Sequence, residues 1–109
     1  MLNLLGKTFE VPEGKLESYA IISAMLPTYF WFQWKELQKI GIQTGLSESE
    51  SREAVSQTMM AALNLMFQSN LTYEQVIDLI PVKPIAEHEE EIKKCFQGKL
   101  LPLFEKIKP

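Results

Sequence analysis

The segment from Pro27 to Leu46 constrains the fold most, because it places five aromatic rings within six consecutive positions of one predicted helix. The rings belong to Tyr29, Phe30, Trp31, Phe32 and Trp34. Pro27 suits the first turn of a helix and Gly45 the residue just past its end, so the segment predicts about five helical turns. Successive rings project all around the axis, and a helix that is apolar on every side is normally buried.

A chain of 109 residues has few elements with which to surround such a helix. We therefore expect a second copy of the chain, or a domain outside this sequence, to cover the aromatic rings. Hydrophobic residues make up 46% of the sequence and charged residues 23%, which is typical of a globular domain. The net charge of −3 argues against a nucleic-acid interface, which needs a clustered basic surface.

The remaining composition favours a cytoplasmic protein with no role at a membrane. The one cysteine, Cys95, excludes an internal disulfide and fits a reducing compartment. The longest strongly apolar run, Tyr29 to Trp34, is far too short to span a bilayer. The first residues lack the basic leader of a signal peptide.

The N-terminal part predicts one strand and one short helix before the aromatic segment. Leu4 to Val11 has strand-forming residues and partial alternation, and this lone strand would need a twin in an oligomer or a sheet outside this chain. Lys15 to Ala24 has helical spacing, and Pro27 forces a break after it. Within the aromatic helix, Gly41 is typical of a close approach between two helices.

Two capping boxes mark further helix starts. Ser47 to Glu50 opens a helix that we expect to reach about Gln68, and Thr72 to Gln75 opens a shorter one. Met59 and Met66 belong to a broad apolar face of the first, which suits a packing surface that adapts to another element. Ordinary core packing is the alternative for each methionine taken singly.

The C-terminal third predicts a linker and a divided helix. Two prolines keep Pro81 to Pro84 extended. A helix starts near Glu87, with acids at its N-terminal end, and Gly98 is expected to end or bend it. Lys99 to Lys108 then forms a last helical turn or two, in which Pro102 is an early residue.

No constellation of residues predicts chemistry by itself. His88 and Glu91 are at i and i+3, but a metal site needs further ligands, and an acidic run is more typical of a solvated helix start. Cys95, beside Phe96, is expected to be packed core rather than a nucleophile. No glycine-rich phosphate loop follows a strand. From the residues alone, this is a helical domain that needs a partner.

Several local motifs occur in an order that resembles the C-terminal helical domain of pyrroline-5-carboxylate reductase. Gly6 to Val11 matches the G-K-x-x-E-V strand of that family. Ser23, Pro27 and Tyr29 match three positions of its S-G-S-G-P-A-Y motif, and Gly41 to Leu46 looks like its G-x-x-x-G-L. Gln57-Thr58 looks like its A-Q-T, and Asp78 looks like the aspartate of its D-M-V segment.

The resemblance implies an all-α fold over residues 1–109. The expected fold is a single bundle of about five helices with a short N-terminal strand, interlocked as a homodimer of the 6-phosphogluconate dehydrogenase C-terminal-like type. The expected dimer interface comprises Tyr29, Phe30, Trp31, Phe32, Trp34, Met59 and Met66. By resemblance, the substrate-side candidates are Ser23, Pro27, Tyr29, Asp78 and Lys83.

Two departures from the family pattern limit what this chain does alone. Where the family has the substrate loop T-S-P-G-G-T-T, Pro81 to Ala86 reads P-V-K-P-I-A, which lacks the glycine N–H groups and threonine hydroxyls that suit an anion. The family's N-terminal dinucleotide-binding domain is absent from this chain, so NADP is expected only for a full-length homologue. The chain is expected to be the dimerisation and substrate-side domain of a diverged NAD(P)-dependent reductase. The alternative is a monomeric adaptor that binds another protein through its Trp/Met surface.

Overall fold

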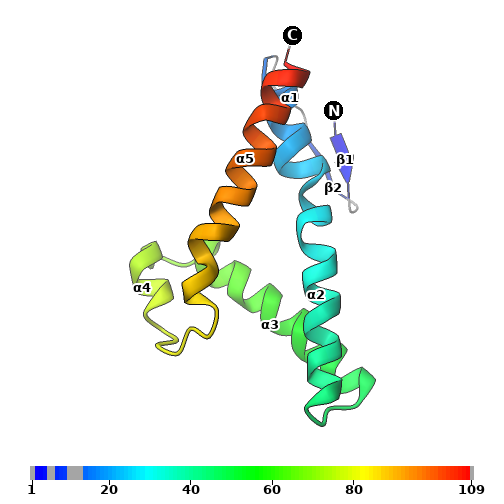
Figure 1. Cartoon of the computed structure of the whole chain (residues 1–109), viewed down its shortest axis with the longest axis vertical. Coiled ribbons are helices and arrows are strands. Elements are labelled where there is room, and N and C mark those ends of the chain that lie inside the picture. The colour runs from blue at the N-terminus through cyan, green and yellow to red at the C-terminus, as the bar shows by residue number, and fades with distance from the viewer. Residues whose placement is uncertain (1, 5–6, 10–13, 109) are drawn as a thin grey trace. The chain divides into compact units, whose positions relative to one another are not determined.

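The computed structural model describes residues 2–4, 7–9 and 14–108, with side chains from 14 onward, and it divides the chain into two compact units. Unit 1 comprises residues 1–31 and 85–109, and unit 2 comprises residues 32–84. The fold is all-α, as predicted. In the described part of the chain, helices α1 to α5 carry most of the structure (Figure 1).

Unit 1 begins with two short antiparallel strands. β1 (Leu2–Leu4) pairs with β2 (Lys7–Phe9), so that Leu2 lies opposite Phe9. The sequence predicted one strand over residues 4–11 that would pair outside the chain. The structure instead pairs β2 with the preceding residues of the same chain, because a hairpin satisfies its backbone groups locally. Glu10 and Val11, the last residues of the predicted strand, lie outside the described residues.

A short helical segment follows in two parts. α1 (Leu16–Tyr19) runs directly into η1 (Ala20–Ala24), a π-helical turn in which the Met25 N–H donates to the Ala20 carbonyl at 3.0 Å. Sequence spacing predicted one regular helix over 15–24. The wider turn comes directly before Pro27, which has no N–H to donate, so the regular hydrogen-bond ladder cannot run on unbroken into the next helix.

α2 (Leu26–Gln43) begins in unit 1 and continues in unit 2. Pro27 lies in its first turn, as predicted, and is buried. At the other end, the Leu46 N–H donates to the Gly41 carbonyl and the Gly45 N–H to the Ile42 carbonyl. These two bonds form a Schellman cap. Gly45 has φ +119°, a region that side chains rarely adopt, which confirms its predicted place just past the helix.

α3 (Glu48–Gln68) and α4 (Tyr73–Ile77) complete unit 2, and both predicted capping boxes are confirmed. At α3, the Ser47 hydroxyl accepts from the Glu50 N–H at 3.1 Å, and the Glu50 carboxylate accepts from the Ser47 N–H at 2.8 Å. The bond from the Ser47 N–H, and secondly the Ser47 side chain, lower the pKa of the Glu50 carboxyl. The predicted end of α3 at Gln68 is also confirmed.

Gly41 allows α2 and α3 to meet closely, as predicted. A Cβ at this position would overlap the Ser51 hydroxyl oxygen and lie 3.1 Å from the Ser51 Cβ. Ser51 is 1% exposed, and its hydroxyl donates to the Gln38 carbonyl at 2.7 Å. A buried hydroxyl with this partner fixes the corner between the two helices.

Unit 1 ends with η2 (Ala86–His88) and α5 (Glu89–Ile107). The sequence predicted that Gly98 ends or bends this helix and that a separate helical segment starts at Lys99. The predicted helix end is wrong, because α5 runs unbroken through Gly98 and Pro102. Proline removes one backbone bond, but the glutamates, lysines and leucines around it favour a helix. α1 packs against the C-terminal half of α5 (Figure 1). Of the helices described, none is long and apolar enough to cross a membrane.

Candidate functional site

The chain leaves most of its large apolar side chains in contact with water. Among residues 14–108, the large apolar side chain with core-like burial is Ile21, at 5% exposed. Trp31 is 58% exposed and Phe32 is 68% exposed, whereas Tyr29, Phe30 and Trp34 are half-buried. The prediction that this chain does not cover its own aromatic helix is therefore confirmed for Trp31 and Phe32.

The half-buried rings of unit 1 gather around Phe96 of α5. The Tyr29 ring meets the Phe96 ring edge to face, with centroids 5.9 Å apart, and the Phe30 centroid lies 6.3 Å from the same ring. The Tyr29 hydroxyl donates to the Ile21 carbonyl of η1 at 2.7 Å. Burial raises the pKa of the Tyr29 hydroxyl above its ordinary value. Tyr29 thus connects the start of α2 to η1 by a hydrogen bond and to α5 by a ring contact.

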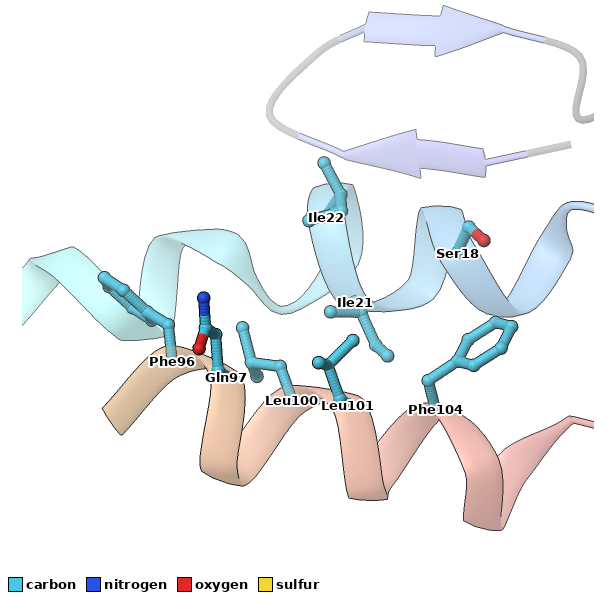
Figure 2. Close-up of a pocket in the computed structure, with 8 residues that line it drawn as sticks. All are labelled: Ser18, Ile21, Ile22, Phe96, Gln97, Leu100, Leu101 and Phe104. Carbon is cyan, nitrogen blue, oxygen red and sulfur yellow. The ribbon is translucent and has the colours of Figure 1, made fainter. Parts of the chain in front are cut away.

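An apolar groove of about 560 Å³ lies between η1 and α5 within unit 1, and Figure 2 shows Ile21 of η1 directed toward Leu101 and Phe104 of α5. Its lining residues are Ser18, Ile21, Ile22, Phe96, Gln97, Leu100, Leu101 and Phe104. Ser18 and Gln97 are the polar members, and none of the eight is charged. Leu101 lines the groove, and 63% of its surface is exposed. Such a groove suits an apolar occupant.

The second half of α3, in unit 2, is a further unpartnered apolar surface. Residues 58–68 contain no charged side chain over three turns of helix. Met60, Leu63 and Phe67 recur at helical spacing and are exposed, Phe67 at 65%. Met59 is half-buried and Met66 is exposed. A helix without charge on any side is normally enclosed by other elements.

The family is identified by comparison with known proteins. The profile for pyrroline-5-carboxylate reductase dimerisation matches residues 13–83, about two thirds of the chain. The chain belongs to the pyrroline-5-carboxylate reductase dimerisation family. Its matched part includes α1 to α4, whereas α5 lies beyond it.

Two relatives of this pyrroline-5-carboxylate reductase-like chain have a curated name, "Pyrroline-5-carboxylate reductase 1". The protein from Bacillus spizizenii (strain W23) is 24% identical over 103 residues, which cover 93% of this chain and 35% of that protein. The protein from Bacillus subtilis (strain 168) is 23% identical over 69 residues, covering 63% of this chain and 23% of that protein. The chain therefore spans about a third or less of the length of these relatives. No solved structure gives a significant match.

The substrate-side candidates of this reductase-like domain fall into two groups. Ser23, Pro27 and Tyr29 lie close together in unit 1, where Ser23 belongs to the π-helical turn and Tyr29 bonds to that same turn. Asp78 directly follows α4 in unit 2 and is exposed. Lys83 is exposed in the linker, and its ammonium donates to the Ile80 carbonyl at 2.8 Å. Their role in holding a substrate stays a prediction.

The sequence-based predictions for Cys95 and His88 have different outcomes. Cys95 is exposed, so its expected place in a packed core is wrong: helical spacing places it opposite the residues of α5 that line the groove. His88 lies 3.7 Å from Glu91, as its spacing predicted, and 3.6 Å from Glu87. All three side chains are more than half exposed, which fits a solvated helix start.

Sequence reasoning missed the groove. Phe96, Leu100 and Phe104 recur at intervals of four residues, which is the signal of one helix face. That signal was obscured by placing a helix end at Gly98, between the first and second of them. The facing residues, Ser18 to Ile22, are far away in the sequence and gave no indication of this contact.

Proposed function

We propose that this chain is the dimerisation and substrate-side domain of a diverged NAD(P)-dependent reductase of the pyrroline-5-carboxylate reductase type, and that it forms a homodimer. The observation that carries the proposal is the excess of exposed surface. The chain exposes 9098 Å², whereas a folded monomer of 12.5 kDa exposes about 6,200 Å² by size scaling.

A division of the chain into two units does not by itself explain the excess. Two separate globules of half the mass would together expose about 7,400 Å², still about 1,700 Å² less than this chain. If each of two copies covers that difference, the interface buries about 3,400 Å² in total, which is in the range of obligate dimers. The apolar character of Trp31, Phe32 and Phe67 supports the same assignment.

The expected interface comprises the aromatic half of α2 together with Met59 and Met66 of α3. The proposed substrate side comprises Ser23, Pro27, Tyr29, Asp78 and Lys83. Because Pro81 and Pro84 lack N–H groups and Lys83 is the one cation of its loop, the proposed substrate is not pyrroline-5-carboxylate itself. We further propose that catalysis and the binding of NADP require a dinucleotide-binding domain in addition to this helical domain.

The test is sedimentation velocity over a concentration series that extends below one micromolar. We expect a species of twice the chain mass at micromolar concentration. Trp31→Ala should weaken dimerisation by about 30-fold or more if this ring is an interface anchor worth about 2 kcal/mol or more. Glu36→Ala, a change of an exposed charge on the same helix, is the matched control and should leave the dimer unaffected.

A protein-binding adaptor is the second candidate, and the exposed Trp31 and Met60 are the observations that favour it. It predicts a monomer at every concentration that binds a dye for apolar surfaces. Under this alternative, Trp31→Ala would leave the melting temperature unchanged. A monomer throughout the concentration series would contradict the homodimer.

A further inference from the structure

We infer that the groove between η1 and α5 is the docking site for the uncharged half of α3, residues 58–68, of a second copy of this chain. This inference rests on the proposed homodimer and specifies which surfaces meet. It assigns a role to α5, which lies beyond the residues matched by the family profile.

The groove has the properties of an acceptor for a helix. Six of its eight lining side chains are apolar, and the two polar ones, Ser18 and Gln97, are neutral (Figure 2). Phe96 and Phe104 are separated by eight residues of α5, which spans about 12 Å along the helix axis. The Phe96 ring is held by Tyr29 and Phe30, so this part of the groove is formed before any partner arrives.

The second half of α3 has the matching properties of a ligand. Met60, Leu63 and Phe67 occupy positions i, i+3 and i+7, the spacing by which an amphipathic helix fills an apolar groove. They span about 10.5 Å along the axis, which is close to the length of the groove. No charged residue between 58 and 68 would lose its hydration on docking.

The area of surface favours a second copy as the occupant. A groove in unit 1 and a helix face in unit 2 occur once in every chain, so two copies related by a twofold axis satisfy both sites at once. In such a dimer both grooves and both apolar faces of α3 are covered. Each chain then covers both a groove and a helix face, which contributes to covering the excess of about 1,700 Å² per chain, whereas a small ligand in one groove would leave most of that excess exposed.

Crosslinking between chains tests the arrangement. Two differently tagged chains are expressed together, one carrying Cys95→Ser with Leu101→Cys and the other Cys95→Ser with Leu63→Cys, and are treated with a short bismaleimide. The control replaces the first chain by the unaltered one, whose native Cys95 is exposed on the side of α5 opposite the groove. Sedimentation of each mixture reports whether the dimer forms.

We expect a covalent mixed dimer from the Leu101 and Leu63 positions, and loss of that product in the Cys95 control. A dimer that sediments normally but gives no such crosslink, or that crosslinks equally in the control, overturns this docking while the homodimer stands. A chain carrying both Leu63→Cys and Leu101→Cys that crosslinks only within itself overturns the second copy as occupant. A monomer in every mixture overturns both the docking and the proposed function.

Discussion

The contact between Gly41 and Ser51 gives a sharp test of how α2 and α3 are fixed in unit 2. Gly41→Ala introduces a methyl group where the Ser51 hydroxyl oxygen lies, with the Ser51 Cβ only 3.1 Å away. Ser51 has little room to move, because it is 1% exposed and its hydroxyl is bonded to the Gln38 carbonyl. The substitution therefore forces either the helices or the hydroxyl out of place.

The net effect is the difference between three terms. Alanine improves the helix propensity of this position by about 1 kcal/mol relative to glycine. Overpacking costs about 1–3 kcal/mol, and displacing the Ser51 hydroxyl from its carbonyl partner costs about 1 kcal/mol more. We expect Gly41→Ala to lower the free energy of unfolding by about 1–3 kcal/mol. Ser51→Ala alone loses the hydrogen bond and should cost about 1 kcal/mol.

The double variant separates sterics from propensity. Without the Ser51 hydroxyl, the methyl group at position 41 still meets the residue-51 Cβ at 3.1 Å and the Leu46 Cδ1 at 3.5 Å, so part of the overpacking is relieved and the propensity gain is kept. We expect the double variant to lose less stability than the two single variants added together, by about 1–2 kcal/mol. The measurement is urea unfolding followed by circular dichroism, with all four proteins at one concentration, because the stability of a dimer depends on concentration.

Additivity would refute this reasoning. If Gly41→Ala costs the same with serine or alanine at position 51, the two residues do not compete for space. A Gly41→Ala protein that is more stable than the parent would show that propensity outweighs packing at this corner. In either case the close approach of α2 to α3 would not be what glycine provides.

Three further substitutions have expected outcomes. Tyr29→Phe removes the hydrogen bond to the Ile21 carbonyl and should lower stability by about 1 kcal/mol in urea unfolding at neutral pH. Because the pKa of Tyr29 is raised in the folded protein, the stability it contributes is fully present below the ordinary tyrosine pKa and is lost as pH rises through the folded value. The free energy of unfolding should therefore decrease less steeply with alkaline pH for Tyr29→Phe than for the parent. Ser47→Ala removes the cap of α3 and should cost about 1 kcal/mol, measured by thermal unfolding. The Ser47 N–H is the main cause of the lowered pKa of Glu50, and the Ser47 side chain is the second. The stability that this lowered pKa provides is present above the ordinary glutamate pKa and declines as pH falls through the folded value. Ser47→Ala removes the side-chain part only, so it should weaken that acid dependence without abolishing it. Gly98→Ala should raise the melting temperature through a gain of up to about 1 kcal/mol, since nothing lies within 4 Å of a Cβ there. A lower melting temperature would show that α5 needs glycine one turn before Pro102.

Local chemistry explains which parts of the fold the sequence could predict. The capping boxes at Ser47 and Thr72 and the glycine cap at Gly45 use neighbouring residues only. The sequence could therefore predict the starts of α3 and α4 and the end of α2. The end of α4 at Ile77 was not predicted, because the sequence placed Leu79 and Ile80 in the same helix. The exposure of aromatic residues on α2 was predicted because a chain of this length has too few other elements to cover five clustered rings. The family also followed from short motifs that keep their order.

Tertiary structure decided the features that depend on distant residues. The hairpin partner of β2, the π-helical turn before Pro27 and the continuity of α5 through Gly98 were not predicted. In each case the local preference was weak or ambiguous, and longer-range packing or the competing demand for hydrogen bonds settled the outcome.

The sequence by itself determined that this chain is helical, where several helices begin and end, and that its aromatic residues exceed what it can cover. Only the tertiary structure placed Ile21 and Ile22 of η1 opposite Leu100, Leu101 and Phe104 of α5, and so created the groove. The physical reason is that a helix cap is a hydrogen bond between near neighbours, whereas a groove requires two faces to meet after the chain has folded back on itself.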